Sequence, residues 1–479
     1  MESIWKKTIE IEGRPSLKED METEVLIIGA GMAGILTGYM LMEAGKKVTV
    51  IEAEEIGSGQ TGNTTAKITS QHNLVYDRLI QTMGKELAYE YAYANQSAIK
   101  EYERVIEKEG IVCDFKTCDA YLYSRRGAEG IKREVEAAGT LGLKAEFTKE
   151  TELPFEVDGA VLFRGQASFH PLKFLQAVAG KLTVFCHTKA LEVKEHSVRT
   201  TGGNIKAEAI VFACHFPFLN VPGYYFMRMH QERSYAIALK GVPVVQNMYL
   251  GVDEDGLSFR GYEDYLLIGG GSHHTGICEP EMGYAPIRLE AERYYKKGKE
   301  AAYWSAQDCM TLDGIPYIGH FSSSTNHIYV ATGFGKWGMT SSMAAACLLR
   351  DLITGKEPVY EKVFSPQRFH LSASAKTLVQ EGMHTVRGFT GKWSNLPQKD
   401  LKKLETGKGI LIEYAGEKVG AYKDERGEVF LVSAICPHLG CELSWNPQEK
   451  SWDCPCHGSR FDYRGRLLDG PAQENLSAS

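Results

Sequence analysis

Four cysteines and two histidines lie within residues 436–457, near the end of this 479-residue chain. They fall in two short segments, CPHLGC at 436–441 and CPCHGS at 454–459, and each segment combines cysteines with one histidine. Closely spaced thiols and imidazoles predict a metal centre, because zinc and iron–sulfur clusters use these ligands. The spacing leaves two alternatives open, a tetrahedral zinc site and a [2Fe–2S] cluster held by two cysteines and two histidines.

The residues around these segments favour the cluster. The second segment continues as CPCHGSRFD, and Gly470-Pro471-Ala472 follows it, whereas a zinc site needs neither feature. Residues 401–476 resemble a Rieske [2Fe–2S] domain of the respiratory type. The resemblance implies an all-β domain and a third cluster loop at 470–472. It also implies the following ligands and disulfide: Cys436, His438, Cys454 and His457 on the cluster, and a Cys441–Cys456 bridge.

One position departs from the respiratory pattern. Rieske proteins of that type have a serine and a tyrosine hydroxyl that donate hydrogen bonds to the cluster. Ser459 matches the serine, but Phe461 stands where the tyrosine is expected. Each donor stabilises the extra negative charge of the reduced cluster, so we expect a midpoint potential below that of the respiratory group.

A second cofactor motif lies near the start of the chain. Residues 24–52 predict a strand, a glycine-rich turn, a helix and a second strand that ends in an acid. In this unit Gly29 makes the turn, Gly31 admits a pyrophosphate, Gly34 lets helix and strand pack closely, and Glu52 accepts from ribose hydroxyls. The sequence therefore predicts a dinucleotide site, and the acid disfavours NADP.

A second glycine-rich unit identifies the dinucleotide. Residues 313–319 read DGIPYIG, and a strand–ATGFG–helix unit follows at 328–355. Together with the first unit, these residues resemble the D-amino-acid oxidase superfamily, which oxidises glycine, sarcosine and D-amino acids. The resemblance implies FAD, an α/β Rossmann-like FAD-binding domain and an α+β substrate domain. Further cofactor contacts follow from it: Thr64, Thr65, Ala66, Lys67, Val193, Gly333, Gly335, Trp337 and Gly338.

The resemblances divide the chain into three parts. The oxidoreductase covers 22–365, with FAD-binding segments at about 22–80, 150–217 and 305–365 and a substrate domain at about 81–149 and 218–304. A helical linker is expected at 366–400, before the Rieske domain at 401–476. The length agrees with several domains rather than one core.

Composition excludes some partners. The net charge is −7 and no basic stripe occurs, so we expect no nucleic acid. No apolar run is long enough to predict a secretory signal or a transmembrane helix. The other seven cysteines are scattered, which favours a reducing, cytoplasmic location. A peripheral position at a membrane is the alternative if the electron acceptor is a quinone.

These features predict a dehydrogenase that oxidises an amine or amino acid by hydride transfer to flavin. The Rieske cluster would then pass single electrons to an external acceptor, a protein or a quinone. The alternative is a flavin and Rieske protein for electron transfer or redox sensing that has no small-molecule substrate of its own.

Several candidate residues have no secure role in this chemistry. The catalytic residues stay unknown, because no general base is visible. Cys309 is interpreted as a buried thiol rather than a covalent attachment point for flavin. Thr340 lies where related amine oxidases carry a carboxylate-binding lysine. His273 and His274 are expected on opposite faces of a strand, where a surface position is favoured over one that faces the flavin cavity.

Overall fold

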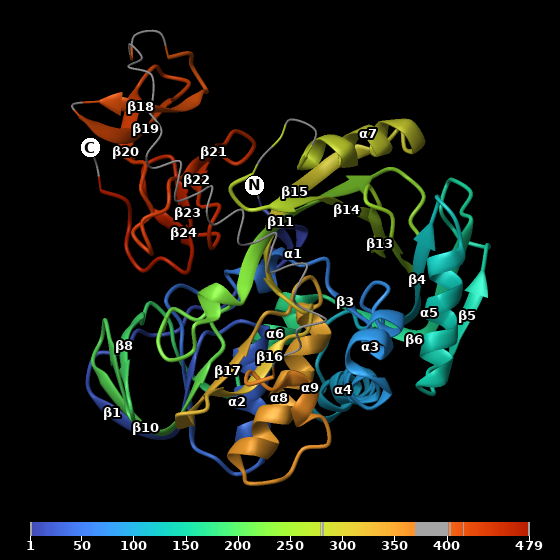
Figure 1. Cartoon of the computed structure of the whole chain (residues 1–479), viewed down its shortest axis with the longest axis horizontal. Helices are drawn as coiled ribbons and strands as arrows, with labels where there is room; N and C mark the ends of the chain where they lie inside the picture. The colour runs from blue at the N-terminus through green and yellow to red at the C-terminus, as the bar shows by residue number, and fades with distance from the viewer. Residues whose placement is uncertain are drawn as a thin grey trace.

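The computed structural model describes residues 2–277, 279, 282–368, 401, 404–414 and 416–477. It contains two large sheets and two small ones, and the small sheets belong to the C-terminal part of the chain (Figure 1). The predicted linker lies outside the described residues from position 369 onward.

The first large sheet has eight strands, and its centre is parallel. Apolar runs such as Val25–Ile28 form its inner strands because both faces of a parallel sheet are covered. In the structure this strand begins at Met21, earlier than the apolar run predicts. In spatial order the main path is β16 (Tyr317–Ser322), β17 (Thr325–Thr332), β10 (Asn204–Phe212), β1 (Met21–Ile28), β2 (Val48–Ile51) and β7 (Thr183–Phe185), with β8 (Ala190–Lys194) and β9 (Ser197–Thr200) at its side.

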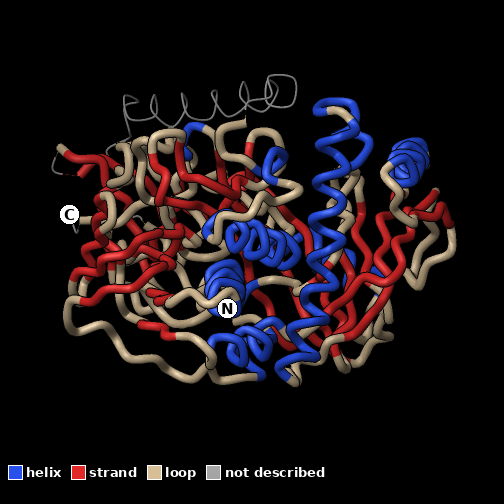
Figure 2. Tube along the Cα trace, turned by 90° about the horizontal axis from the view of Figure 1, so that it is seen from below, coloured by secondary structure: helices blue, strands red, loops and turns tan. Residues whose placement is uncertain are grey.

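Helices α2 (Met32–Glu43) and α8 (Gly338–Ile353) pack against each other and, with α6 (Pro171–Ala179), cover this sheet. Helix α2 has no charged residue before Glu43 and is buried on nearly every side, which suits a helix enclosed by a sheet and other helices. Figure 2 shows most of the helices in the middle of the molecule, with strands on both sides of them. The other α-helices of the described residues are α1 (Ile4–Thr8), α3 (Tyr76–Met83), α4 (Lys85–Glu109), α5 (Glu129–Thr140), α7 (Tyr284–Tyr294) and α9 (Glu361–Phe364).

The second large sheet has nine mixed strands. It takes strands from both predicted substrate segments and also from their neighbours in sequence, since β3, β6 and part of β15 come from segments assigned to FAD binding. Its strands are β15 (Lys299–Thr311), β11 (Met229–Lys240), β14 (Tyr265–His274), β13 (Ser258–Tyr262), β12 (Met248–Gly251), β4 (Lys116–Ser124), β6 (Gly159–Ser168) and β3 (Lys67–Ile68), with β5 (Ala145–Thr148) paired to β6.

The C-terminal domain is all-β, as predicted. Trp452 is fully buried at its centre, and Gly420 lets its ring approach the backbone, because a Cβ there would lie 2.7 Å from the indole. The two small sheets are β18 (Gly409–Tyr414), β19 (Glu417–Lys423) and β20 (Val429–Ser433), and β21 (Ser444–Asn446), β22 (Ser451–Asp453), β23 (Arg460–Asp462) and β24 (Leu467–Asp469).

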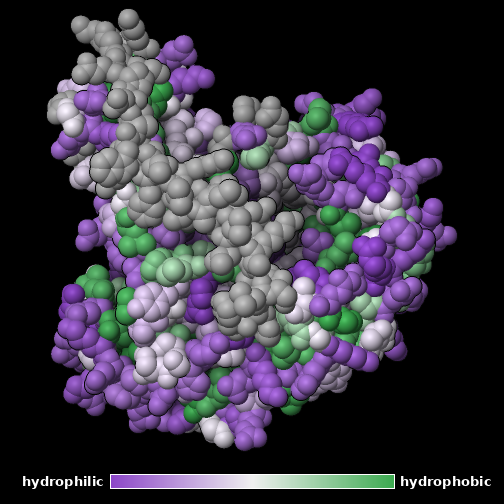
Figure 3. Space-filling view, in the orientation of Figure 1, coloured by the Kyte–Doolittle hydropathy of each residue, from purple (hydrophilic) through white to green (hydrophobic). Residues whose placement is uncertain are grey.

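The surface is mainly hydrophilic on the face drawn in Figure 3, with small separate hydrophobic patches. In the described residues, we find no helix with the length and apolar character that crossing a membrane requires.

The first testable prediction concerns the contact between α2 and the glycine turn. A Cβ at Gly34 would lie 1.9 Å from the carbonyl oxygen of Gly29, so Gly34→Ala must push the helix away from the strand. We expect a loss of about 1–3 kcal/mol in unfolding free energy. Gly139→Ala on the exposed face of α5 is the control, because a Cβ there meets nothing within 4 Å and should stabilise the helix by roughly 0.5–1 kcal/mol. Chemical denaturation that finds Gly34→Ala as stable as the parent would contradict this packing.

Candidate functional site

The two cysteine–histidine segments form matching loops. In the first, the Cys436 N–H donates to the Cys441 carbonyl at 2.8 Å and the Gly440 N–H donates to the Cys436 carbonyl at 3.0 Å. In the second, Cys454 and Gly458 make equivalent bonds, to the Ser459 carbonyl at 2.8 Å and the Cys454 carbonyl at 3.0 Å. Gly440 and Gly458 both have φ near +81°, a conformation that favours glycine.

The fold brings the four predicted cluster ligands together. The rings of His438 and His457 lie 4.9 Å apart and nearly perpendicular. Cys436 and Cys454 are free, buried and hydrogen-bonded to each other. That bond lowers the pKa of Cys436 to about 7 and raises the pKa of Cys454. Two thiols and two imidazoles therefore converge on one place, as a [2Fe–2S] centre of this type requires.

The histidines are prepared to bind metal. Among the described residues, neither His438 Nδ1 nor His457 Nδ1 has a hydrogen-bond partner, although both atoms are buried. Burial lowers the pKa of His438 to about 4 and that of His457 to about 3, so both imidazoles are neutral near pH 7. A neutral imidazole with an unpartnered buried nitrogen is suited to ligate iron. The residues present thus fit the cluster.

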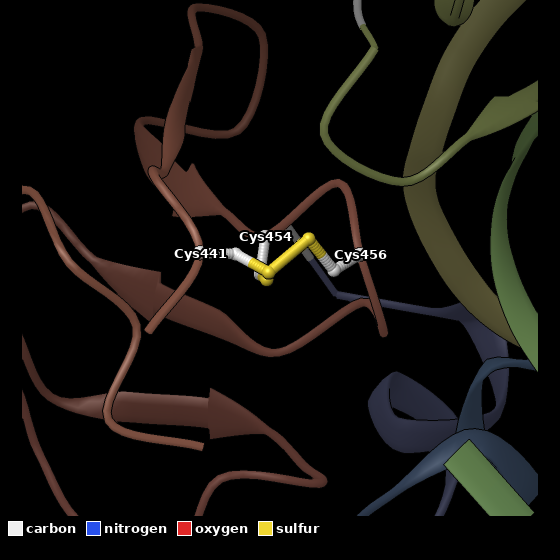
Figure 4. Close-up of side chains that lie close together, drawn as sticks. All are labelled: Cys441, Cys454 and Cys456. Carbon is white, nitrogen blue, oxygen red and sulfur yellow. A yellow bond between two sulfur atoms is a disulfide. The ribbon is translucent and has the colours of Figure 1, made fainter. Parts of the chain in front are cut away.

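A disulfide joins the two loops, as predicted, between Cys441 and Cys456. The Cys454 sulfur lies beside it, within 4.8 Å of both bridged sulfurs (Figure 4). The bridged sulfurs offer no thiolate, so this group of three is not itself a ligand set. The Cys454 thiol is therefore available as a cluster ligand together with Cys436.

Other residues surround the predicted cluster ligands. The Ser459 hydroxyl lies beside the Cys436 sulfur and helps to lower the pKa of that thiol. The same hydroxyl accepts from the Ala472 N–H at 3.0 Å, which places the predicted third loop at the site. Phe461 is fully buried in the hydrophobic cluster that also contains Cys436 and Cys454.

The first glycine turn is as tight as the motif predicts. Gly29 has φ +112°, and a Cβ there would lie 2.6 Å from the Ala213 carbonyl oxygen. A Cβ at Gly31 would lie 3.2 Å from the Thr61 hydroxyl, in the loop that follows β2. This turn lies at the carboxyl end of the parallel sheet, next to the N-terminus of α2, where a pyrophosphate is favoured.

Glu52 lies at the end of β2 beside this turn. Its carboxylate accepts from the N–H of Ala30 at 2.7 Å and from the N–H of Glu54 at 3.0 Å. Burial raises the pKa of Glu52. The Glu52 carbonyl accepts from Thr188, just before β8, the strand that carries Val193.

The second glycine turn meets strand β15. Gly333 and Gly335 both have positive φ, and the Gly335 N–H donates to the Cys309 carbonyl at 2.9 Å. Cys309 is 1% exposed, which agrees with its interpretation as a buried thiol. Burial raises the pKa of Cys309 to about 12. Trp337 follows, at the start of α8, and stacks on His72 with ring centres 4.7 Å apart. Gly338 is the first residue of the helix.

A cavity of about 90 Å³ joins several predicted contacts. Thr64, Thr65, Lys67 and Trp337 line it, whereas Ala66 is not part of its wall. Sequence reasoning missed the opposite wall, which comes from β4, β12 and β13 and includes the following residues: Tyr121, Leu122, Met248, Tyr249, Leu250 and Ser258. These residues carry no motif and are brought here only by strand pairing.

Lys67 contributes an amine to the wall of this cavity. Its Nζ donates to the Tyr249 carbonyl at 2.9 Å and to the Ser258 hydroxyl. Burial, with a smaller contribution from Arg260, lowers the pKa of Lys67 to about 7. Arg260, which the sequence did not point to, donates to the carbonyls of Thr65 and Ala66 and so fixes this segment.

One expectation about histidines was wrong. His273 is 6% exposed and hydrogen-bonded to the Tyr235 hydroxyl at 2.8 Å, so it is not a surface residue. His274 points the other way and stacks on His230. Thr340 does not line the cavity. Its hydroxyl accepts a hydrogen bond from the Thr69 N–H and donates one to the Thr69 carbonyl, so it connects α8 to the segment after β3.

Comparison with known proteins defines the class. The model of the FAD dependent oxidoreductase family, DAO, matches residues 24–352, and the model of the Rieske [2Fe-2S] domain matches residues 394–478. The chain therefore belongs to the DAO family of FAD-dependent oxidoreductases and carries a C-terminal Rieske domain. Its cofactors are FAD and a [2Fe–2S] cluster.

A relative matches this chain along almost its whole length. YhfW of Bacillus subtilis (strain 168), named as a Rieske 2Fe-2S iron-sulfur protein, is 37% identical over 99% of this chain and 97% of its own length. The cytochrome b6-f complex iron-sulfur subunit 1 of Nostoc sp. (strain PCC 7120 / SAG 25.82 / UTEX 2576) is 46% identical over 48 residues. That match covers 10% of this chain and 27% of the subunit.

Solved structures share the fold of the oxidoreductase part. Glycine oxidase from Geobacillus kaustophilus has a TM-score of 0.62 at 20% identity and covers 73% of this chain and 99% of its own. L-Proline dehydrogenase from P. horikoshii has a TM-score of 0.61 at 19% identity, over 74% and 98% of the two chains. L-Amino acid deaminase from Proteus vulgaris has a TM-score of 0.59 at 18% identity, over 75% and 100%.

The buried amine of Lys67 leads to a prediction about pH. The unfolded chain holds the Lys67 proton up to about pH 10.5, whereas the folded protein releases it near pH 7. Between these values the unfolded state binds more protons, so this group makes stability rise with pH. Lys67→Met should remove that part of the slope, and Lys194→Met, on an exposed lysine, should not. Unfolding free energies from pH 7 to 9 measure the difference, and an unchanged slope in Lys67→Met would rule out a neutral buried amine.

The surroundings of Phe461 lead to a second prediction. Phe461→Tyr adds a hydroxyl next to the cluster position, and a hydrogen bond to sulfur stabilises the reduced form. The midpoint potential should rise by roughly 40 mV, since about 1 kcal/mol per hydrogen bond corresponds to that shift for one electron. Phe430→Tyr, on β20, is the control, because its ring packs on Tyr463. Protein-film voltammetry that detects no rise in Phe461→Tyr would show that a hydroxyl at this position does not control the potential.

Proposed function

We propose that the protein is a dehydrogenase that oxidises an amine or amino acid at FAD and delivers electrons through its Rieske cluster to an external acceptor. The observation that carries this proposal is the position of strand β11. Its Met229 sulfur lies 3.8 Å from the Thr332 hydroxyl, beside the second glycine turn. Two residues later, the Gln231 amide donates to the His457 carbonyl at 2.7 Å. One strand therefore contacts both the flavin-binding turn and a cluster ligand.

The residues of this chain have separate tasks in the proposed reaction. Gly29, Gly31, Gly34 and Glu52 would hold FAD, the last through its ribose. The set of Cys436, His438, Cys454 and His457 would hold the cluster. When bound, FAD accepts the two electrons of C–H oxidation, and the cluster carries one electron at a time.

The cavity next to Lys67 is the proposed substrate site. Its wall is mostly apolar, with Leu122, Met248 and Leu250, and it would exclude water from one side of the reacting carbon. Lys67 and the Ser258 hydroxyl supply the polar end. This arrangement suits a small amine or amino acid with an apolar side chain. The named substrates of the structural neighbours, which include glycine, L-proline and L-amino acids, support the same class.

The second candidate function is an electron-transfer or redox-sensing protein without its own substrate. It also explains the contact between β11 and the cluster loop. The two candidates differ in one respect: only a dehydrogenase is reduced by a small donor in the absence of any other protein. The acceptor, a protein or a quinone, would be shared by both.

Anaerobic reduction tests the proposal. The protein should contain about two irons and two acid-labile sulfides per chain, and its flavin should bleach with a member of a panel of amines and amino acids. The cluster should become reduced in the same sample. Cys454→Ala should keep the bleaching and lose the cluster signal, whereas Cys347→Ala, in α8, should keep both.

Each contrary result has a distinct meaning. No bleaching with any donor would favour the second candidate. Bleaching that leaves the cluster oxidised would contradict electron delivery through it. One zinc per chain without sulfide would remove the cluster from the proposal.

A further inference from the structure

The cluster loops are packed against the FAD-dependent part of the chain. The Gln231 amide donates to the His457 carbonyl at 2.7 Å and to the Gly470 carbonyl at 2.9 Å. The Gln307 amide, on the neighbouring strand β15, donates to the Gly458 carbonyl at 2.6 Å. Both glutamines are at most 1% exposed, so these bonds are made away from water.

A buried ion pair fixes the same interface. Arg233 donates to Glu449 through two nitrogens, at 2.6 and 2.9 Å, and both side chains are no more than 3% exposed. Arg460 lies 3.2 Å from the same carboxylate. A buried pair of this kind needs its full set of partners, so it permits one relative position of the two parts.

In this position both histidines of the cluster site contact the oxidoreductase part. His457 is 4% exposed, and the ring of Phe226 lies 5.7 Å from it and 6.3 Å from His438. The outer nitrogen of His438, Nε2, lies 3.1 Å from the Asn220 Oδ1. Asn220 belongs to the loop that joins β10 to β11.

The tautomer of His438 follows from the ligand set. The unpartnered nitrogen, Nδ1, is the one available to iron, so Nε2 carries the proton. Nε2–H therefore donates, and the Asn220 amide oxygen accepts. An acceptor on the outer nitrogen increases the electron density of the imidazole and favours the more positive, oxidised cluster.

We propose that Asn220, a residue of the oxidoreductase part, is the hydrogen-bond acceptor of the cluster ligand His438, and that it lowers the midpoint potential of the cluster. Asn220 is thus a positioning residue that acts through His438. The inference rests on the ligand set given under the proposed function. It also implies that an external acceptor does not use the Nε2 of His438 while Asn220 occupies it.

A redox titration of the full-length holoprotein, followed by electron paramagnetic resonance of the cluster, tests the proposal. Asn220→Ala removes the acceptor, so the midpoint potential should rise. Asn220→Asp replaces a neutral acceptor by a charged one, so the potential should fall below that of the parent protein. Asn326→Ala is the matched control, because Asn326 is exposed on β17, and its potential should not change.

The opposite shifts separate the hydrogen bond from a loss of structure. A merely structural role predicts shifts of the same sign in both Asn220 variants, and that result would overturn the inference. Unchanged potentials in both, with the spectrum of the parent, would also overturn it and leave the proposed function standing. If the parent protein itself gives no Rieske spectrum, the proposed function fails first.

Discussion

The ion pair between Arg233 and Glu449 is the interaction on which the arrangement of the two cofactor sites depends. Burial alone would raise the pKa of Glu449, but Arg233 and Arg460 hold it well below its usual range. The carboxylate is therefore charged, and each of its oxygens has a partner. Breaking a buried pair by removing one partner costs about 3–5 kcal/mol, whereas an exposed pair contributes much less. The buried charge pair thus acts together with the hydrogen bonds of Gln231 and Gln307 at the same domain interface.

This constraint explains why β11 can serve two sites. Alternate residues of a strand face opposite sides, so Gln231, Arg233 and Tyr235 share one face. Gln231 and Arg233 contact the C-terminal domain directly, and the Tyr235 hydroxyl lies 3.3 Å from Glu449. Met229, on the same strand, reaches the second glycine turn. The strand pairs with β15 on one side and with β14 on the other along most of its length.

The sequence predicted the parts of the site that are local in the chain. Gly29, Gly34 and the loops at 436–441 and 454–459 could be recognised because each needs a particular backbone shape within a few residues. The strands and helices expected around the two glycine units are also present, although β1 begins at Met21 and β17 begins at Thr325, both earlier than predicted. The disulfide between Cys441 and Cys456 followed from the resemblance.

Contacts between distant segments could not be predicted in this way. Arg260 lies nearly two hundred residues from the Thr65 and Ala66 carbonyls that it binds, and nothing in its local sequence marks it. His273 was expected at the surface because strand alternation says which face a residue takes, not what covers that face. The Tyr235 hydroxyl, which also lies 3.3 Å from Glu449, is hydrogen-bonded to it here. The contact of Asn220 with His438 could not be predicted for the same reason, because only the docking of the two domains brings these residues together.

Two features of the cluster surroundings act on its potential in the same direction. Phe461 lacks the hydroxyl that would stabilise the reduced form, and the acceptor that we propose at His438 stabilises the oxidised form. One feature belongs to the cluster domain and the other to the oxidoreductase part, so docking adds to a tendency that the domain already has. A cluster at lower potential can still deliver electrons to an acceptor of moderate potential. The fusion of the two domains therefore does more than bring the two cofactor sites close together, because the oxidoreductase part also contributes to the electronic environment of the cluster.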